Sequence, residues 1–204
     1  MASTPDAAAQ TLVAQAGAAL WDAAFDEARR QAEMALATLV DHGPVPPWRA
    51  GALGARAWAA AMAGHVDAGL LVDDAVAGLA GCVDADLTDD LAAAHLVAQA
   101  ALSGERLEQS EAVGMRLRAL ADGAGDVRQR SEIDLTVARA QLFQGRLDDA
   151  GARVDGALAG LCPLAAGTGG AAPNQIRFGL SIRAFLEAMT GDHDAARATL
   201  DEVL

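Results

Sequence analysis

The residues that could carry chemistry in this 204-residue chain are glycines, acids, histidines and arginines gathered in short stretches. The stretch AGTGGAA, residues 166–172, has the glycine content of a phosphate-binding loop, in which consecutive backbone N–H groups hold an anion. A Walker loop also needs Lys after its last Gly, and all 15 basic residues of this chain are Arg. A dinucleotide-binding turn needs a preceding strand, whereas a helix is expected here. We therefore interpret 166–172 as a connector between repeats.

The acidic segment VDADLTDD, residues 83–90, is a candidate calcium site. Its four aspartates would give hard oxygen ligands of the kind that calcium prefers. The segment nevertheless lacks the Gly and the distant Glu of a calcium-binding loop. We interpret it as a solvated loop followed by a helix start at Thr88, where acidic residues favour the helix dipole. The sequence thus predicts no metal site and no cofactor.

Histidine and cysteine side chains do not form a recognisable catalytic pattern. No HExxH or GxSxG motif occurs, and three of the four histidines fall in expected turns. The fourth, His95, falls inside an expected helix, where a packing role is predicted. Cys82 and Cys162 lack the close pairing of a zinc site and are interpreted as reduced, packed thiols. We predict that none of the four histidines is catalytic: His42, His65, His95 and His193. We also predict that the protein is not an enzyme.

The charge of the chain limits its partners. The formal net charge is -13, and binding to nucleic acid needs clustered basic residues. The richest arginine group could bind a carboxylate or phosphate, but we interpret it as solvated charge balanced by nearby acids; it contains Arg116, Arg118, Arg128 and Arg130. No apolar run reaches the ~20 residues of a membrane span. No basic residue precedes the first apolar stretch, so the chain lacks the charged start of a secretory signal, and we expect a cytoplasmic protein. From the charge and the lack of a long apolar run, we expect that it contacts neither nucleic acid nor membrane.

The elements that must position these side chains are helices. Apolar residues make up 52% of the chain but aromatic residues only 3%, with no Tyr. A core built largely from Ala, Leu and Val suits closely packed helices, and the strand-forming aromatic residues are scarce. The sequence therefore predicts an all-α fold.

One phrase recurs along the chain, QGRLDDAGARVDGAL at 144–158 being its clearest copy. Aligned on the small residue before each turn, successive copies are spaced by 41, 40, 41 and 46 residues; the aligned positions are Ala23, Gly64, Gly104, Gly145 and Gly191. A regular period of about 20 to 50 residues is the signature of stacked repeats. Glycine suits the turn because it reaches left-handed backbone angles.

Each turn is followed by an apolar residue and then by a small one. The apolar residues are expected to anchor the second helix of each copy: Phe25, Val66, Leu107 and Leu147, with His193 breaking the rule. The small residues should let two antiparallel helices approach closely: Ala28, Gly69, Ser110, Ala150 and Ala196.

These spacings resemble the tetratricopeptide repeat, whose second half has the form xGxYxxAxxxxxxAL. Gly145, Leu147 and Ala150, followed by Ala157 and Leu158, stand at matching spacings, and the first copy matches almost as well. The other copies are degenerate: Arg56 and Arg183 stand where the family usually buries Leu, and the period exceeds the family's, which is about 34 residues. The resemblance implies a right-handed α-solenoid of about five antiparallel helix pairs. We expect one domain, 1–204, with repeats at 6–40, 48–80, 89–122, 127–161 and 174–204.

The resemblance also implies a mode of action. In such an array the first helices of the pairs line a concave groove, the default site for a protein or peptide partner. In the tetratricopeptide register the residues facing it are Trp58, Met62, Ala94, Ala98, Leu135, Arg139, Ser181 and Phe185. Long, Ala-rich copies also resemble the repeat segments of large bacterial transcription regulators of the maltose-activator and LuxR-like class. We expect an interaction scaffold of that kind; the alternative is a helical domain that senses a small molecule, or an atypical all-helical enzyme.

The last helix carries Leu200, Val203 and Leu204 and has the character of one that another repeat would cover. Solenoids normally finish with a polar capping helix. We therefore expect either a fragment of a longer protein or self-association through this helix.

Overall fold

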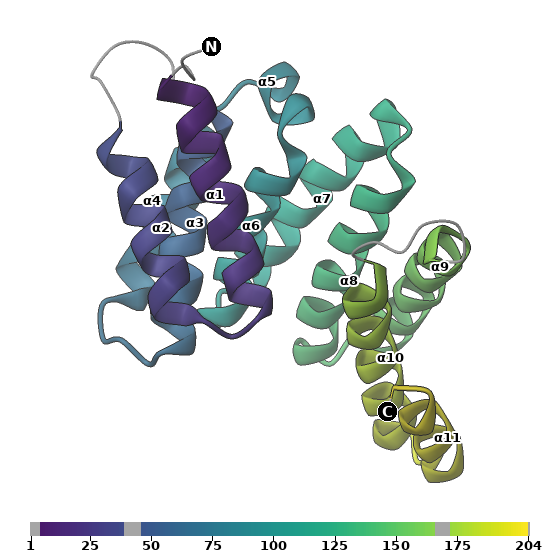
Figure 1. The fold of residues 1–204 in the computed structure, drawn as a ribbon. Helices are drawn as coiled ribbons and strands as arrows, with labels where there is room; N and C mark the ends of the chain where they lie inside the picture. Colours follow the sequence, from purple (N-terminus) through teal and green to yellow (C-terminus); the bar gives the residue numbers. More distant parts are fainter. Residues whose placement is uncertain (1–4, 39–45, 166–171, 204) are drawn as a thin grey trace. The chain divides into compact units, whose positions relative to one another are not determined.

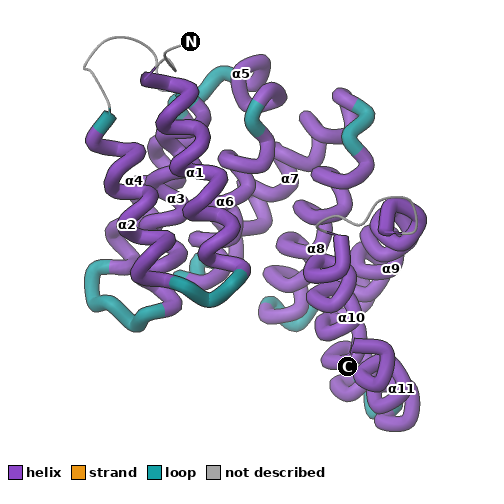
Figure 2. The backbone as a smooth tube through the Cα atoms, in the orientation of Figure 1, coloured by secondary structure: helices purple, strands orange, loops and turns teal. Residues whose placement is uncertain are grey.

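A computed structural model describes the chain over residues 5–38, 46–165 and 172–203, and these residues form α-helices joined by short turns without a strand (Figures 1 and 2). The helices are α1 Pro5–Trp21, α2 Phe25–Ala37, α3 Pro47–Met62, α4 Ala68–Ala80, α5 Asp84–Asp89, α6 Leu91–Ser103, α7 Leu107–Ala124, α8 Val127–Phe143, α9 Leu147–Ala165, α10 Ala172–Met189 and α11 His193–Val203. The predicted all-α class is confirmed. His42 and nearly all of the glycine-rich connector, 166–171, lie outside the described residues.

The chain divides into two compact units, Met1–Leu120 and Ala121–Leu204, with the boundary inside α7. In unit 1, α1 packs on α2 and α3 packs on α4, while α3 also lies against α1, α2 and α6. In unit 2, α8 packs on α9 and α10 packs on both α9 and α11. Neighbouring helices along the chain thus form hairpins within each unit. The single-domain organisation expected from the sequence stays a prediction.

The turns inside the hairpins share one hydrogen-bond pattern. After α3, Gly64 takes a left-handed φ of 70° and donates its N–H to Ala61, while the His65 N–H reaches back to Ala60. The turns at Gly145 and Gly191 repeat this pattern with φ of 79° and 89°. It is the Schellman ending of a helix, which satisfies the last carbonyl groups. Ala23 adopts the same conformation at φ 56°, although its Cβ disfavours it.

The third turn departs from the sequence alignment by one residue. Glu105, at φ 60°, is the left-handed residue, whereas Gly104 has φ -86° and caps α6. The reason for glycine at 104 is space: a Cβ there would lie 2.9 Å from Cγ2 of Val72 on α4. The aligned position Gly104 was therefore wrong as the left-handed residue of this turn.

Most of the expected anchors begin their helices, but Val66 does not. Phe25, Leu107 and Leu147 are the first residues of α2, α7 and α9. Val66 is fully exposed, because the turn after α3 continues to Asp67 and α4 starts at Ala68. The expectation for Val66 was therefore wrong.

The small residue of the second helix is buried as expected in four of the five copies, and Gly69 of α4 is half-buried. Ala28, Ala150 and Ala196 are buried. Ser110, which stands where the tetratricopeptide pattern has Ala, is fully buried, and its hydroxyl donates to the carbonyl oxygen of Ala98 at 2.9 Å. The hydroxyl is accommodated because it takes up a backbone acceptor on the facing helix.

A close helix contact in unit 1 joins α3 to α6 through two glycines. A Cβ on Gly54 would lie 2.7 Å from the backbone N of Val97 and 2.8 Å from the carbonyl carbon of Leu96. A Cβ on Gly51 would lie 2.7 Å from Cβ of Ala93. Both glycines are therefore required for these two backbones to approach as closely as they do. Around this contact the core is rich in buried Ala, and Trp58 meets Trp21 edge to face at 5.5 Å.

His95 lies in the core of α6. The side chain is almost completely buried, and burial lowers the pKa of His95 to about 4 from its ordinary 6.5. The imidazole is therefore neutral at physiological pH. This burial agrees with a packing role.

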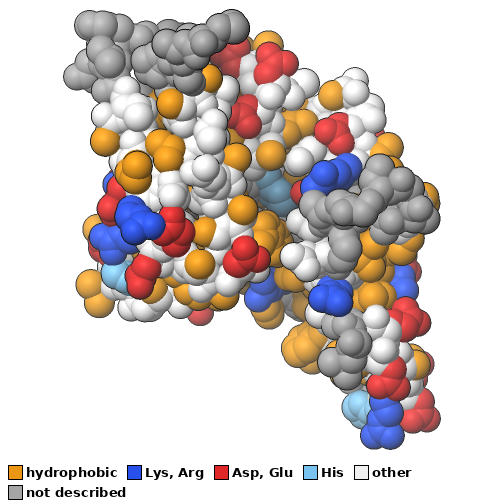
Figure 3. Space-filling view, viewed as in Figure 1, with side chains coloured by type: hydrophobic (Ala, Val, Ile, Leu, Met, Phe, Trp, Pro, Cys, Tyr) orange, Lys and Arg blue, Asp and Glu red, His pale blue; other side chains and the backbone are white. Residues whose placement is uncertain are grey.

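The face of the molecule drawn in Figure 3 carries side chains of both charges. Acidic and basic side chains are scattered among apolar ones on this face. Arg29 on α2, for example, pairs with Glu33 and also contacts His65. None of the described helices is long and apolar enough to cross a bilayer.

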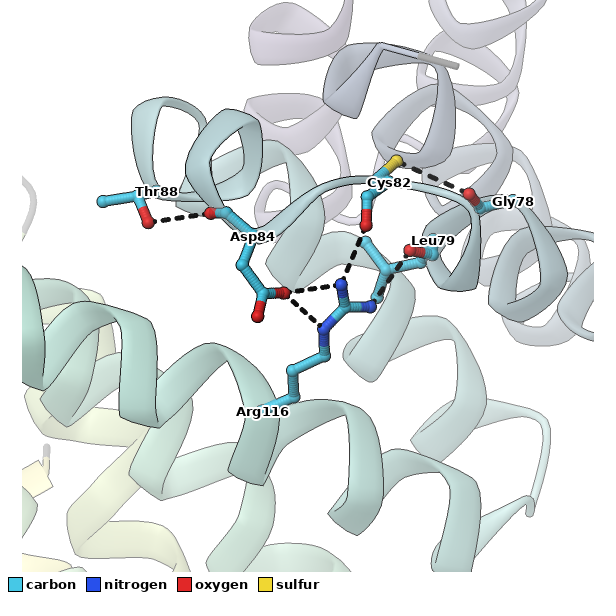
Figure 4. A network of polar contacts seen from close by, with 6 residues as sticks. All are labelled: Gly78, Leu79, Cys82, Asp84, Thr88 and Arg116. Carbon is cyan, nitrogen blue, oxygen red and sulfur yellow. Dashed lines mark hydrogen bonds and ion pairs between the residues drawn. The ribbon is translucent and has the colours of Figure 1, made fainter. Parts of the chain in front are cut away.

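The acidic segment 83–90 forms the short helix α5, so the expected helix start at Thr88 was wrong. Leu87 is fully buried and fixes α5 to the unit, and the Thr88 hydroxyl donates to the carbonyl of Asp84 (Figure 4). The Asp84 carboxylate accepts two hydrogen bonds from Arg116 of α7. Asp84 is thus engaged in an ion pair.

Arg116 also caps the C-terminal end of α4. Its guanidinium donates to the carbonyl oxygens of Leu79 and Cys82 at 3.1 and 2.9 Å (Figure 4). Cations near a helix C-terminus stabilise the free carbonyl groups and the negative end of the dipole. The arginine that the sequence offered as an anion site is therefore already committed, as are Arg128 to Glu132 and Arg130 to Asp122.

We expect Gly54→Ala to destabilise unit 1, because the added methyl meets backbone atoms of α6 and forces the helices apart. The loss should be about 1–3 kcal/mol in the free energy of unfolding, as for other overpacked cores. All three tryptophans lie in unit 1, so urea unfolding followed by Trp fluorescence measures it. Gly17→Ala on α1 is the matched control, since its Cβ would contact Leu96 at an ordinary 3.6 Å. That variant should be neutral or gain up to about 1 kcal/mol in helix propensity. Equal effects of the two changes would contradict the close α3–α6 contact.

Stability of unit 1 should fall as the pH drops from about 6.5 to about 4, because His95 binds a proton in the unfolded chain before it does in the folded one. Between pH 7.5 and 5 the loss from this residue is about 2 kcal/mol. Burial raises the pKa of Asp90 and so contributes with the opposite sign. The pH dependence of stability is therefore compared between the wild type and His95→Gln, a variant in which every carboxylate is unchanged. A variant with the same pH dependence as the wild type would rule out this role of His95.

Candidate functional site

The predicted groove residues fall into two groups. Four of them are buried in helix interfaces and present almost no surface to a partner: Trp58, Ala94, Ala98 and Leu135. Met62, at the end of α3, is exposed. The remaining three, Arg139, Ser181 and Phe185, come together in unit 2. The assignment of these residues to partner binding stays a prediction, and its accessible part consists of Met62 on α3 and the three residues on α8 and α10.

The site is an apolar pocket of about 260 Å³ between α8 and α10. From α8 it is lined by Arg139, Leu142 and Phe143, and from α10 by Phe178, Ser181, Ile182 and Phe185. Leu142 and Ile182 are buried and form its base. Phe143 and Phe185 are 52% and 51% exposed, so two aromatic rings stand in solvent at its edge. We call this site the α8–α10 pocket.

The pocket exists because α8 and α10 both pack on α9 through small and aliphatic residues. Leu135 of α8, Leu158 of α9 and Leu180 of α10 belong to one buried cluster. Gly179 makes room for it, because a Cβ there would lie 2.8 Å from Leu158 Cδ2 and 3.1 Å from Leu135 Cδ2. Aliphatic side chains thus fill the core of unit 2. Phe178 packs against this cluster, while Phe143 and Phe185 stand at the edge of the pocket.

The aromatic residues of unit 2 are all in this one place. The unit contains no Trp or Tyr, and its three aromatic residues are Phe143, Phe178 and Phe185. Exposed aromatic rings do little for the stability of a core, whereas they are enriched at the centres of protein interfaces.

Arg139 supplies the charge of the pocket. Its guanidinium carbon lies 5.4 Å from the centroid of the Phe143 ring and 5.6 Å from that of Phe178. Both distances are within the range of cation–π attraction. Burial lowers the pKa of Arg139, since the rings replace part of its hydration. The rings therefore fix a partly desolvated cation beside an apolar surface.

Sequence reasoning found Arg139, Ser181 and Phe185 but missed Phe143 and Phe178. Phe143 is the last residue of α8, one turn beyond the position that the repeat register places in the groove. A signal was available, since three of the four phenylalanines fall in the last 62 residues, 143–204. Their spacing on two separate helices gave no sign that they converge.

A second depression, of about 530 Å³, lies in unit 1 at the turn between α1 and α2. It is lined partly by charged residues, and two of these, Glu27 and Arg30, pair with each other. It contains one aromatic side chain, Phe25, which is half-buried. It therefore has fewer features of a binding site than the α8–α10 pocket.

The other candidates from the sequence give no site within the described ranges. No three His, Cys, Asp or Glu side chains of the described residues come close enough together to hold a metal ion. Cys82 is buried, and burial raises the pKa of its thiol, but Cys162 is exposed, so the expectation of two packed thiols was wrong for Cys162. Its position near the end of α9 puts it beyond the buried cluster of unit 2.

Comparison with known proteins places the fold. No protein-family model and no curated protein matches the chain. Two crystal structures of kinesin light chain-like, nearly identical TPR-like repeats from Podosopora anserina are similar to it, one of them a single-substitution variant. They are 18% identical with TM-scores of 0.62 and 0.61, covering 100% and 99% of this chain and 95% of theirs. The fold is therefore that of a TPR-like helical-repeat solenoid, as the sequence predicted.

Proposed function

We propose that the chain is a non-enzymatic scaffold that binds a protein or peptide segment at the α8–α10 pocket. The observation that carries this proposal is the gathering of every aromatic residue of unit 2 around one pocket, with two rings half exposed. Helical-repeat solenoids use the faces of their first helices as binding surfaces, and α8 and α10 are the first helices of the two hairpins of this unit.

The size of the pocket favours a partner's side chains over a free small molecule. Pockets that enclose a whole small ligand measure about 300–1,000 Å³, and the α8–α10 pocket is below this range at about 260 Å³. Its edge is formed by exposed Phe143, Ser181 and Phe185, which gives an open site. An open pocket of this size suits one or two anchoring side chains of a longer segment. At this pocket the small-molecule alternative thus has less support.

We also propose a cellular setting on the basis of the repeat type. The long, Ala-rich copies support a scaffold within a bacterial transcription regulator, acting in the cytoplasm. Self-association through α11, where Leu200 is exposed, is a separate proposal that light scattering at several protein concentrations would test.

The test of the binding site is the double variant Phe143→Ala with Phe185→Ala. A random peptide display library selected on the purified wild-type chain supplies the probes, and biolayer interferometry on synthetic copies measures Kd. Loss of two aromatic anchors should weaken binding by about tenfold or more. Circular dichroism should be unchanged, because both rings are half exposed.

The matched control is Met34→Ala with Leu70→Ala, which also removes two exposed apolar side chains but in unit 1. Its Kd should equal that of the wild type. Peptides that bind the double phenylalanine variant as well as the wild type, or a selection that yields no binding peptide, would contradict the proposal.

A further inference from the structure

We propose that the segment bound in the α8–α10 pocket carries an Asp or Glu side chain next to an aliphatic or aromatic one, and that Arg139 binds its carboxylate. This inference rests on the proposed function and adds the chemistry of the partner. It follows from three features of unit 2: the position of Arg139, the pairing of the acids around it, and the apolar character of the remaining lining.

Arg139 is held in place by aromatic rings and not by an acidic side chain. Its guanidinium lies within cation–π range of two aromatic rings, those of Phe143 and Phe178. The cause of its lowered pKa is desolvation, with no nearby carboxylate offsetting it. Among the described residues, no carboxylate forms an ion pair with it. It is therefore a partly buried cation whose counter-ion is not supplied by the described residues.

The acids on the helices that form the pocket are all engaged elsewhere. Glu132 of α8 pairs with Arg128, and Asp134 of α8 pairs with Arg153 of α9 at 2.6 Å. Glu187, the single acid of α10, accepts a hydrogen bond from Thr199 at 2.8 Å. These carboxylates are held by partners of their own, so none of them is available to Arg139 without breaking a contact.

The rest of the lining offers no second polar donor. The Ser181 hydroxyl donates to the carbonyl of Arg177 at 2.8 Å, and the other lining residues are Leu, Ile and Phe. Arg139 is thus the one charged group of the lining. Its planar guanidinium can donate two parallel hydrogen bonds to a carboxylate while its face stays on the rings.

Desolvation decides between an apolar and an acidic occupant. A purely apolar side chain in the pocket would remove more water from the guanidinium and leave a buried charge unpaired, which is costly. A carboxylate beside the apolar group restores the lost hydrogen bonds. The two groups must lie close together, since the guanidinium is only 5.4 Å from the Phe143 ring that an apolar side chain would contact. Neighbouring residues, or residues one helical turn apart, satisfy this.

The overall charge makes the recognition local. At a net charge of -13 the protein repels acidic segments at long range, so an acidic peptide gains nothing from general attraction. Added salt screens that repulsion over about 10 Å at 0.1 M, while a contact inside the pocket is screened less. Binding of the acidic peptide should therefore not weaken as salt is raised to 0.5 M.

The experiment uses the full chain and the tightest peptide from the display selection. Its Asp or Glu is replaced by Asn or Gln, and Kd is measured for both peptides on the wild type and on Arg139→Gln. On the wild type the amide peptide should bind about tenfold more weakly or worse. On Arg139→Gln the two peptides should bind within twofold of each other, because the group that distinguishes them is gone. Arg139→Lys, which keeps the charge without the planar fork, should restore part of the difference.

Arg197→Gln on exposed α11 is the control, since it removes the same charge outside the pocket. It should leave the tenfold difference between the peptides intact. This inference would be overturned if the selected peptides lacked an acid beside an apolar residue, or if the amide peptide bound the wild type as tightly as the acidic peptide. Either result would leave the proposed scaffold function standing. A selection in which no peptide depends on Phe143 and Phe185 would overturn both.

Discussion

Close approach of helix backbones is the constraint on which the structure depends. Gly51 and Gly54 let α3 meet the backbone of α6 with no room for a single methyl group, and Gly179 of α10 leaves room for the side chains of Leu135 and Leu158 in unit 2. Few large side chains are then needed to fill the interior, which is why so much of the core is Ala. A core of this kind is stabilised by many small contacts, and each of them requires the helices to keep their spacing.

This way of packing leaves the large residues for other uses. In unit 1 the tryptophans are drawn into the core, where Trp58 contacts Trp21. In unit 2 the buried cluster is aliphatic, with Phe178 packed against it, and all three phenylalanines line the α8–α10 pocket. The charged groups are divided in a similar way. The acids of α8 and α10 are held by partners within the unit, while Arg139 contacts the aromatic rings. The pocket therefore differs from the rest of unit 2, because two aromatic rings are exposed there and the arginine contacts rings in place of an acid.

The sequence predicts the helices and turns well because these depend on local signals. The repeated glycine turns and the buried small residues Ala28, Ala150 and Ala196 could be found by spacing alone. It was less successful where a distant residue decides: Gly104 faces Val72 of another helix, so its glycine has a packing reason that mimics a turn signal. The α3–α6 contact could not be predicted either, since Gly51 and Gly54 read only as weak helix formers until α6 is placed beside them. For the site, the register identified Arg139 and Phe185, but the convergence of Phe143 and Phe178 depends on how α8 and α10 pack on α9.

The choice of arginine at the α8–α10 pocket has a consequence for control. Although burial lowers its pKa, a guanidinium keeps its proton throughout the physiological range, in contrast to histidine. It also lacks the amine that acetylation of lysine would neutralise. The pocket is therefore permanently cationic, and neither acidification nor acylation of this side chain could turn it off. Masking or loss of the acid of the occupant would remove the contact with Arg139 while leaving this charge unchanged.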